Sequence, residues 1–386
     1  MSGRDVNGGG GKVDKVGFLR KGAPLMVAVV LLLSILVGIV SNVWGSGTEM
    51  SFGPAELTGA GQRVPQLTGN TRHGEISVAH VRALSEDFYD RFSFSYQEMH
   101  TAAWIVEVLL AIGYTWGDIE VQEFTVDSAI GYTELGFMIY LAYFFDSTPF
   151  MNLGTRASRQ SQNVILTVPG RSDEVIVVGA HYDTVMYPGA SDNASGVALL
   201  LESAQRMLQI DNYYTITYVF FGAEESGLFG SFYYANSLTR QQHDNILFMI
   251  NADVLLDGED LFYMAGYDNN GRPGANRITE TWDGIAQSVN ARHGTNFEPL
   301  PAGVFGPSDQ LAFLPWGHTA MFLAGLETFD GWQDIHFDLA IAQMGRVLHS
   351  TRDDYHYINE RWPGKMEEVM WAFSIFLEEL LLASYS

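Results

Sequence analysis

The stretch EVIVVGAHYDT (residues 174–184) indicates the fold class of this 386-residue chain. It begins with an almost uninterrupted apolar run rich in β-branched residues, which is typical of a strand buried on both faces of a parallel sheet. The run ends in two polar side chains, His181 and Asp183. A strand of this kind requires neighbouring strands on both sides and covering helices above and below.

The segments around this strand alternate between helical and extended patterns. Apolar residues recur at helical spacing in residues 95–114, where Gly113 provides a stop, and in residues 195–208. Period-two or continuous apolar patterns predict four further strands, at residues 118–126, 162–170, 215–225 and 245–253. The alternation predicts an α/β fold with a mostly parallel sheet and helices on both of its faces.

Side chains that bind metals or transfer protons stand at the ends of the predicted strands. In open α/β sheets, functional groups gather at the carboxyl ends of the strands. Burying so many carboxylates without a partner would be prohibitive, so a bound cation is the economical explanation. The residues at these ends, in the following loop and late in the chain are His181, Asp183, Asp192, Glu224, Glu225, Asp253, His349 and His356.

The spacing of these residues suggests different tasks for them. His181 and Asp183 face the same side of an extended chain, so Asp183 can accept the far N–H of the imidazole. The neighbours Glu224 and Glu225 point apart, so one can bind metal while the other reaches the water. Asp192 stands in a loop rich in Gly and Ser and is free to bridge two metal ions.

The composition excludes several classes of protein. The chain carries 45 Asp and Glu against 21 Lys and Arg, a net charge of −24, which argues against a nucleic-acid partner because phosphate recognition needs clustered basic residues. It contains no cysteine, so disulfides, thiol nucleophiles and Cys-ligated zinc are excluded. Any metal site must therefore use histidine and carboxylate ligands.

The N-terminal part predicts a membrane anchor. Residues 1–22 form a basic tail, and residues 23–43 form an uncharged run long enough to cross a bilayer as a helix. Because positive charge precedes the run, we expect a cytoplasmic N-terminus and an extracytoplasmic catalytic domain at residues 76–386, after a linker at 44–75. Secretion after cleavage of a signal peptide is the main alternative, and a buried core helix is a weaker one.

A second apolar segment, at about residues 128–155, does not fit the alternation. Glu134 and Asp146 interrupt it, and it is too short to span a membrane convincingly. An inserted buried helix is the simplest interpretation. A hairpin or amphipathic element that dips into the bilayer or covers the active site is the alternative.

Five ordered motifs resemble the di-zinc exopeptidases of metallopeptidase family 28, which include bacterial leucyl aminopeptidases and glutaminyl cyclases. The motifs are GAHYDT, GASDNASG, FFGAEESGLFGS, INAD and LHSTRDD. The resemblance implies a three-layer α/β/α zinc-exopeptidase fold with a mostly parallel mixed sheet, a final covering helix at residues 366–383, and two Zn²⁺ ions. The implied ligands are His181 and Asp253 for one zinc, Glu225 and His349 for the other, and Asp192 as the bridge.

The resemblance also implies the remaining roles. Glu224 is expected to be the general base and Asp183 to orient His181, while the loop GPSDQLAF brings Ser308 and Asp309 near the substrate. His349 is preferred to His356 as the last ligand because it heads the His-Ser-Thr-Arg-Asp pattern that the family uses. We therefore expect an aminopeptidase that acts on peptides with a free N-terminus. A glutaminyl-peptide cyclase and an inactive receptor-like ectodomain are the alternatives.

Overall fold

The computed structural model describes residues 65–125, 160–185, 187–265, 276–300, 308–326 and 347–385. The predicted membrane run at 23–43 and the apolar segment at 128–155 both lie outside these residues. Among the helices that are described, none is both long enough and apolar enough to cross a bilayer.

A single eight-stranded mixed sheet forms the centre of the structure, in the order β1-β2-β4-β3-β5-β8-β6-β7. Strands β4, β3, β5 and β8 run parallel to one another. The pairs β1–β2, β2–β4 and β6–β8 are antiparallel, and β7 pairs with β6 in parallel. The strands are β1 (Ile119–Thr125), β2 (Gln160–Val168), β3 (Ser172–His181), β4 (Tyr214–Phe221), β5 (Ile246–Ala252), β6 (Asp260–Ala265), β7 (Glu298–Pro299) and β8 (Ala320–Leu326). The predicted mixed α/β fold is confirmed.

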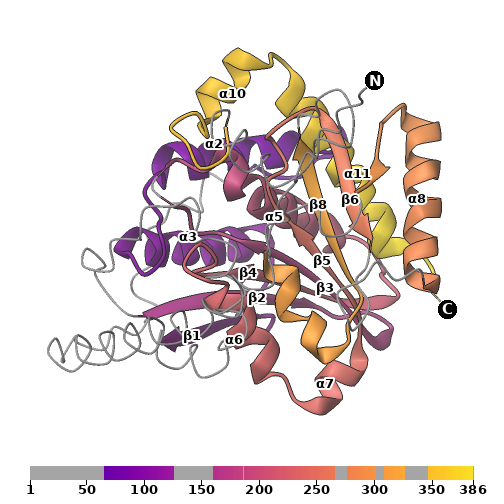
Figure 1. Cartoon of the computed structure of the whole chain (residues 1–386). Helices are drawn as coiled ribbons and strands as arrows, with labels where there is room; N and C mark the ends of the chain where they lie inside the picture. The colour runs from indigo at the N-terminus through magenta and orange to yellow at the C-terminus, as the bar shows by residue number, and fades with distance from the viewer. Residues whose placement is uncertain are drawn as a thin grey trace, which may run out of the picture. The chain divides into compact units, whose positions relative to one another are not determined.

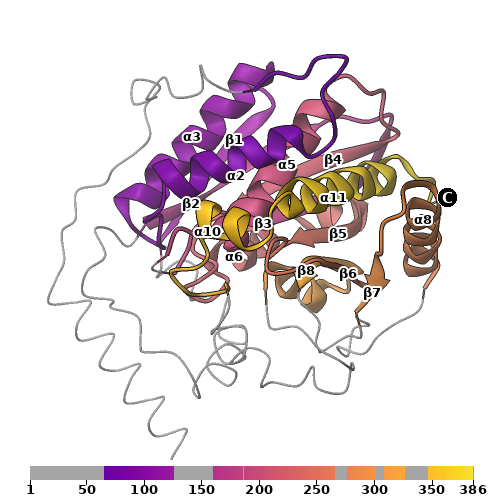
Figure 2. The same cartoon turned by 90° about the horizontal axis from the view of Figure 1, so that it is seen from above.

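Helices cover both faces of this sheet (Figures 1 and 2). One face carries α2 (Glu75–Asp87), α3 (Tyr96–Ile112), α5 (Gly196–Met207), α8 (Arg277–His293) and α11 (Lys365–Leu382), with the short α10 (Tyr355–Arg361) leading into α11. The other face carries α6 (Phe229–Ser237), α7 (Arg240–Asn245) and two 3₁₀ turns, Asp309–Ala312 and Leu314–Trp316.

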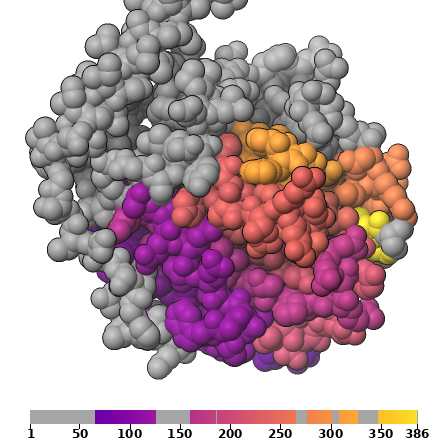
Figure 3. Space-filling model, turned by 90° about the horizontal axis from the view of Figure 1, so that it is seen from below, coloured from indigo at the N-terminus to yellow at the C-terminus, as the bar shows by residue number. Residues whose placement is uncertain are grey.

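The alternation of side chains along β3 explains why both faces are covered. Ile176 and Val178 join the large hydrophobic cluster under α5 and α11, while Val177 joins the smaller cluster under α6. All three side chains are fully buried. Figure 3 shows the molecule from the side of this second face. There Trp316 stacks on His243 of α7, with ring centroids 4.0 Å apart. A strand apolar on both faces thus fixes a layered fold.

Most predicted elements appear within one to three residues of their expected ends. The helix predicted at 95–114 is α3, whose N-cap Ser95 accepts a hydrogen bond from the Glu98 amide and whose end is Gly113. The strand predicted at 215–225 is β4, but it ends at Phe221. Residues 222–225 instead form a turn, and Ala223 has a positive φ of 54°.

Candidate metal centre

His181 is the last residue of β3, and its side chain is almost completely buried. Its Nδ1 lies 3.1 Å from the backbone oxygen of Asp183 and 3.5 Å from Asp183 Oδ1. A proton on Nδ1 can therefore be donated to this backbone oxygen, which leaves Nε2 free as a ligand. Nε2 faces Asp192 Oδ1 at 3.1 Å and Asp253 Oδ1 at 3.2 Å.

Asp192 lies in the turn Ala190–Ser195 that precedes α5. Two hydrogen bonds hold this turn to Asp353, from the Ser191 amide to Oδ1 (2.5 Å) and from the Asp192 amide to Oδ2 (3.0 Å). The turn also approaches the end of β5 closely, because a Cβ on Gly196 would lie only 2.2 Å from the oxygen of Ala252. A glycine is therefore required where α5 begins, and Asp192 is fixed next to the residue that follows β5.

Glu224 and Glu225 lie in the turn after β4, and both are largely buried. Their backbone amides donate to the carboxylate of Asp183, to Oδ1 at 3.0 Å and to Oδ2 at 3.2 Å. Asp183 also accepts a hydrogen bond from Ser93 Oγ at 2.5 Å. The carboxylate of Asp183 thus holds the glutamate turn, in addition to lying beside His181.

Asp253 follows β5 directly, and its Oδ2 accepts a hydrogen bond from Ser308 Oγ at 2.7 Å. Ser308 Oγ in turn accepts a hydrogen bond from Asn251 Nδ2 at 2.8 Å. Ser308 and Asp309 are both buried. In this arrangement Ser308 orients Asp253, and the predicted contact of Ser308 and Asp309 with substrate stays a prediction.

His349 comes from the far end of the chain and meets the opposite side of Asp192. Its Nε2 lies 3.0 Å from Asp192 Oδ2 and 3.5 Å from Glu225 Oε1. The two oxygens of Asp192 therefore face two different histidines. His356, in contrast, is 62% exposed and lies 3.0 Å from Glu86 Oε1 on the surface.

The charges of this site do not balance within the protein. Among the described residues, Arg91 is a fully buried cation whose charge acts on the site carboxylates. His181 and His349 are the other groups of the site that can carry positive charge. Against them stand seven buried carboxyl groups, those of Asp183, Asp192, Glu224, Glu225, Asp253, Asp309 and Asp353. Histidine nitrogens and carboxylate oxygens within 4.8 Å of one another are the donors that divalent zinc binds. The donor set fits bound cations.

The same crowding shifts the pKa values of the site. Burial would lower the pKa of His181, but the carboxylates of Asp253 and Glu224 outweigh it and raise this pKa well above its usual value. Burial would raise the pKa of Asp192, but hydrogen bonds from His181 and His349 outweigh burial and hold it well below its usual range. Burial and then the charge of Asp192 raise the pKa of Glu225 to about 7.

Metal-free protein is expected to lose stability as the pH rises from about 5 to 8. Burial raises the pKa of both Glu225 and Asp309 to about 7 in the folded state. Between the ordinary carboxyl pKa values and pH 7 the folded protein therefore binds more protons than the unfolded chain, and the free energy of unfolding falls as the pH rises. A shift of this size on Glu225 corresponds to about 3 kcal/mol. Melting temperatures at both pH values, with chelator and with added zinc, measure the effect.

The control for this experiment is Asp309→Asn, which removes one carboxyl with a raised pKa and should weaken the pH dependence of the metal-free protein. Added zinc should restore more stability at pH 8 than at pH 5. A metal-free protein that melts higher at pH 8 than at pH 5 would contradict the explanation.

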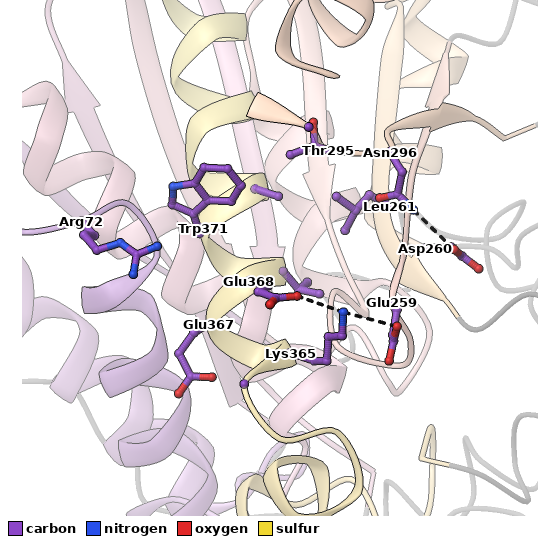
Figure 4. Close-up of a pocket in the computed structure, with 14 residues that line it drawn as sticks. Arg72, Glu259, Asp260, Leu261, Thr295, Asn296, Lys365, Glu367, Glu368 and Trp371 are labelled. Carbon is purple, nitrogen blue, oxygen red and sulfur yellow. Dashed lines mark hydrogen bonds and ion pairs between the residues drawn. The ribbon is translucent and has the colours of Figure 1, made fainter. Parts of the chain in front are cut away.

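A separate surface pocket of about 660 Å³ lies at the N-terminal end of α11 (Figure 4). Its lining includes Arg72, Trp371 and Lys365, and Lys365 Nζ lies 2.9 Å from Glu368 Oε2 and 3.5 Å from Glu259 Oε2. None of the candidate metal-site residues lines this pocket. The Lys365 charge is paired with those of Glu259 and Glu368, and we assign this pocket no part in the chemistry.

Sequence reasoning missed several residues that hold the site together. The sequence places Asp353 in the LHSTRDD motif but assigns it no role. In the structure its carboxylate accepts hydrogen bonds from the Ser191 and Asp192 amides. Arg91 and Glu98 carry no motif at all, and only their burial in the structure reveals them. A single arginine outside the predicted helices, strands and motifs gives no recognisable sequence signal.

Residues 163–374, more than half of the chain, match the family model described as Peptidase family M28. The chain belongs to peptidase family M28. The match contains every proposed metal ligand, whereas α2, α3 and β1 precede it.

Curated relatives of this M28 peptidase are aminopeptidases. It is 33% identical over 109 residues to aminopeptidase YwaD of Bacillus subtilis, which covers 27% of this chain and 24% of the relative. It is 34% identical over 118 residues to an aminopeptidase of Pseudomonas aeruginosa, with 30% and 22% covered. The "Probable lipoprotein aminopeptidase LpqL" of Mycobacterium tuberculosis is 31% identical over 152 residues, with 38% and 29% covered. The matches thus span about a quarter of the length of these relatives.

Solved structures share the fold of this M28 chain. The zinc aminopeptidase BSAP from Bacillus subtilis superimposes with a TM-score of 0.60 at 15% identity, covering 81% of this chain and 96% of the other. A glutaminyl cyclase from an Acidobacteriales bacterium gives a TM-score of 0.56 at 20% identity, covering 83% and 97%. Because both activities occur on this fold, the fold alone does not choose between them.

Proposed function

We propose that this chain is a zinc-dependent aminopeptidase that removes N-terminal residues from peptides. The observation that carries the proposal is the position of Asp192, whose Oδ1 lies 3.1 Å from His181 Nε2 and whose Oδ2 lies 3.0 Å from His349 Nε2. A carboxylate that faces two histidines with its two oxygens is suited to bridge two metal ions.

The proposed ligands divide into two sets that share Asp192. His181 and Asp253 would hold one zinc, and His349 and Glu225 the other. The distances of 3.2 Å from His181 Nε2 to Asp253 Oδ1 and of 3.5 Å from His349 Nε2 to Glu225 Oε1 support this division. Family membership and the zinc aminopeptidase named among the structural neighbours support zinc as the metal.

Glu224 is the proposed general base. Its carboxylate lies in one cluster with His181 and Asp253, so it can reach the space between the ligand sets. Two bound zinc ions would supply Lewis-acid activation of the water and of the scissile carbonyl. Glu224 takes the proton from the attacking water and returns it to the leaving amine. In the metal-free site, burial raises the pKa of Glu224 well above its usual value, although nearby His181 opposes this.

The preference for a free N-terminus follows from the excess of carboxylates. A substrate α-amine carries a positive charge that these groups attract, which would place the first peptide bond at the metals and the base. Ser308 and Asp309 stay proposed as substrate-binding residues. In this proposal the enzyme cleaves the peptide bond that follows the first residue of the substrate.

Purified protein is expected to bind close to two zinc ions per chain and to hydrolyse aminoacyl amides with a free amine but not their N-acetylated forms. A panel of chromogenic aminoacyl substrates, run with and without chelator and accompanied by metal analysis, measures this. Equal turnover of blocked substrates would refute the aminopeptidase proposal. Ammonia release from N-terminal glutaminyl peptides would favour the cyclase, and zinc binding without any turnover would favour the receptor-like ectodomain.

We also propose that residues 23–43 anchor the catalytic domain, residues 76–386, to a membrane. The basic tail and the uncharged run support this, and one relative bears the name of a lipoprotein. The full chain is expected to stay in the pellet when membranes are washed with alkaline carbonate, as does an integral marker protein. Release of the full-length chain into the supernatant would contradict an anchor, and a shortened soluble chain would favour signal cleavage.

A further inference from the structure

The segment that joins α2 to α3 contacts two of the segments that carry proposed metal ligands, the end of β3 and the turn after β4. It precedes the residues that match the family model. Phe92 forms an isolated bridge with Thr184, and Phe94 packs beside Ala223 and Phe229 with the two phenylalanine ring centroids 5.8 Å apart. The segment therefore lies between the end of β3 and the turn after β4.

Arg91 in this segment is fully buried and donates hydrogen bonds to five backbone carbonyl groups. Its Nε binds the oxygen of Tyr182 at 2.7 Å, and Nη2 binds that of Gly189 at 2.7 Å. Its Nη1 binds Pro188 O at 2.6 Å and also the oxygens of Leu84 and Phe88 at the end of α2, at 3.1 and 3.2 Å. Tyr182 follows His181, and Gly189 stands three residues before Asp192, so one guanidinium ties both ligands' backbones to α2.

The positive charge of Arg91 also interacts with the carboxylates of the site. Burial lowers the pKa of Arg91 to about 10, and the carboxylates of Asp353, Asp183, Asp192 and Glu225 act against that decrease. The side chain therefore stays charged at neutral pH, and its charge faces the carboxylate-rich site while its donors are bound to neutral carbonyl groups.

Glu98, in the first turn of α3, binds the backbone of the turn that follows β4, as Arg91 binds the backbone after β3. Its Oε1 accepts hydrogen bonds from the Ala223 amide at 2.9 Å and from Ser161 Oγ at 2.7 Å, and Oε2 accepts one from the Phe94 amide. The next two amides, those of Glu224 and Glu225, donate to Asp183. Three consecutive amides of this turn are thus bound by two buried carboxyl groups.

We propose that Arg91 and Glu98 are positioning residues for the metal centre: Arg91 fixes the backbone between His181 and Asp192, and Glu98 fixes the turn that carries Glu224 and Glu225. The inference rests on the proposed metal ligands, but it concerns how their backbones are held. Neither side chain touches the substrate or a metal in this assignment.

The test compares Arg91→Lys and Glu98→Gln with the wild-type full chain. Lysine has one ammonium in place of a fork of five donors, so it cannot bind the same carbonyl groups. Arg91→Lys should weaken zinc binding to the metal-stripped protein by about 10–100-fold, the range seen when groups behind metal ligands are changed. Glu98→Gln loses at least one amide acceptor and should lower kcat by about tenfold with little change in KM. Isothermal titration with zinc, steady-state kinetics and melting temperature provide the three readouts.

Matched controls come from Arg206 and Glu202, a largely buried ion pair on the helical face. Arg206 Nε donates to Glu202 Oε1 at 2.9 Å, and Glu202 accepts from the amides of Gly74 and Ser77. Arg206→Lys and Glu202→Gln should lower the melting temperature as much as the test variants do, yet leave zinc affinity and kcat within about threefold of wild type. Arg91→Ala with millimolar guanidinium adds a rescue experiment, in which the added cation should recover zinc affinity.

The outcomes separate this inference from the proposed function. If wild-type protein binds zinc and both test variants match it in zinc affinity and kcat, the positioning roles are wrong while the proposed metal site stands. If the test variants and controls change zinc affinity equally, Arg91 and Glu98 are only general stabilisers. If the wild-type protein binds no zinc, the proposed metal site itself fails. Should Arg91→Lys not fold, Glu98→Gln and the guanidinium rescue decide.

Discussion

Replacing Glu224 with glutamine is expected to lower kcat by about 10²–10⁴-fold while zinc content stays at the wild-type level. Glutamine keeps the size of the side chain but cannot take the proton from water. The hydrogen bond that fixes this residue comes from its backbone amide, 3.0 Å from Asp183 Oδ1, so the substitution leaves the turn in place. Steady-state kinetics and metal analysis of the same preparation measure both quantities.

Glu225→Gln is the matched control for this prediction. It makes the same chemical change one residue along the chain, at a carboxylate whose Oε1 lies 3.5 Å from His349 Nε2. Glu225→Gln should lose zinc affinity, whereas Glu224→Gln should not. If the Glu224 variant retains activity within tenfold of wild type, another group is the base.

Asp192→Ala is expected to cause the largest loss of metal. Because the two oxygens of Asp192 face His181 and His349, its removal takes a ligand from both proposed zinc ions at once. Metal ions stabilise transition-state charge by several kcal/mol, so activity should fall by at least about 10³-fold. Zinc titration of the metal-stripped variant should show weakened binding at both sites.

Two histidine variants provide comparisons for Asp192→Ala. His349→Ala removes a ligand of one proposed zinc only and should reduce the number of tightly bound ions toward one. His356→Ala changes an exposed histidine that pairs with Glu86 and should behave like wild type. If His356→Ala loses zinc and His349→Ala does not, the choice between them is wrong.

The central strands of the fold were predictable because burial on both faces leaves a clear pattern. The prediction at residues 174–184 corresponds to β3 and the one at 245–253 to β5. The direction of the outer strands was not predictable, since periodicity is the same for parallel and antiparallel pairing. The sheet is parallel through β4, β3, β5 and β8, but β2 runs antiparallel to β4 and β6 runs antiparallel to β8. "Mostly parallel" describes its centre better than its edges.

The site was predictable in its residue types and less so in its local backbone. Glu224 and Glu225 were expected at the end of an extended strand, with side chains alternating. In the structure the strand ends at Phe221, and the glutamates lie in a turn. The reason is tertiary, because Asp183 and Glu98 bind the amides of this turn from other parts of the chain. Residues so distant in sequence leave no local pattern.

The meeting of distant segments at Asp192 also bears on how the chain keeps its shape. Asp253 lies 72 positions beyond His181, and Asp353, which holds the Asp192 turn, lies 162 positions beyond Ser191. A chain without cysteine cannot close such loops covalently. Metal ions held between these segments would act as reversible cross-links of the folded state, which they would stabilise by their binding free energy. Loading with metal must then follow folding, and withdrawal of metal would loosen the ends of the central strands.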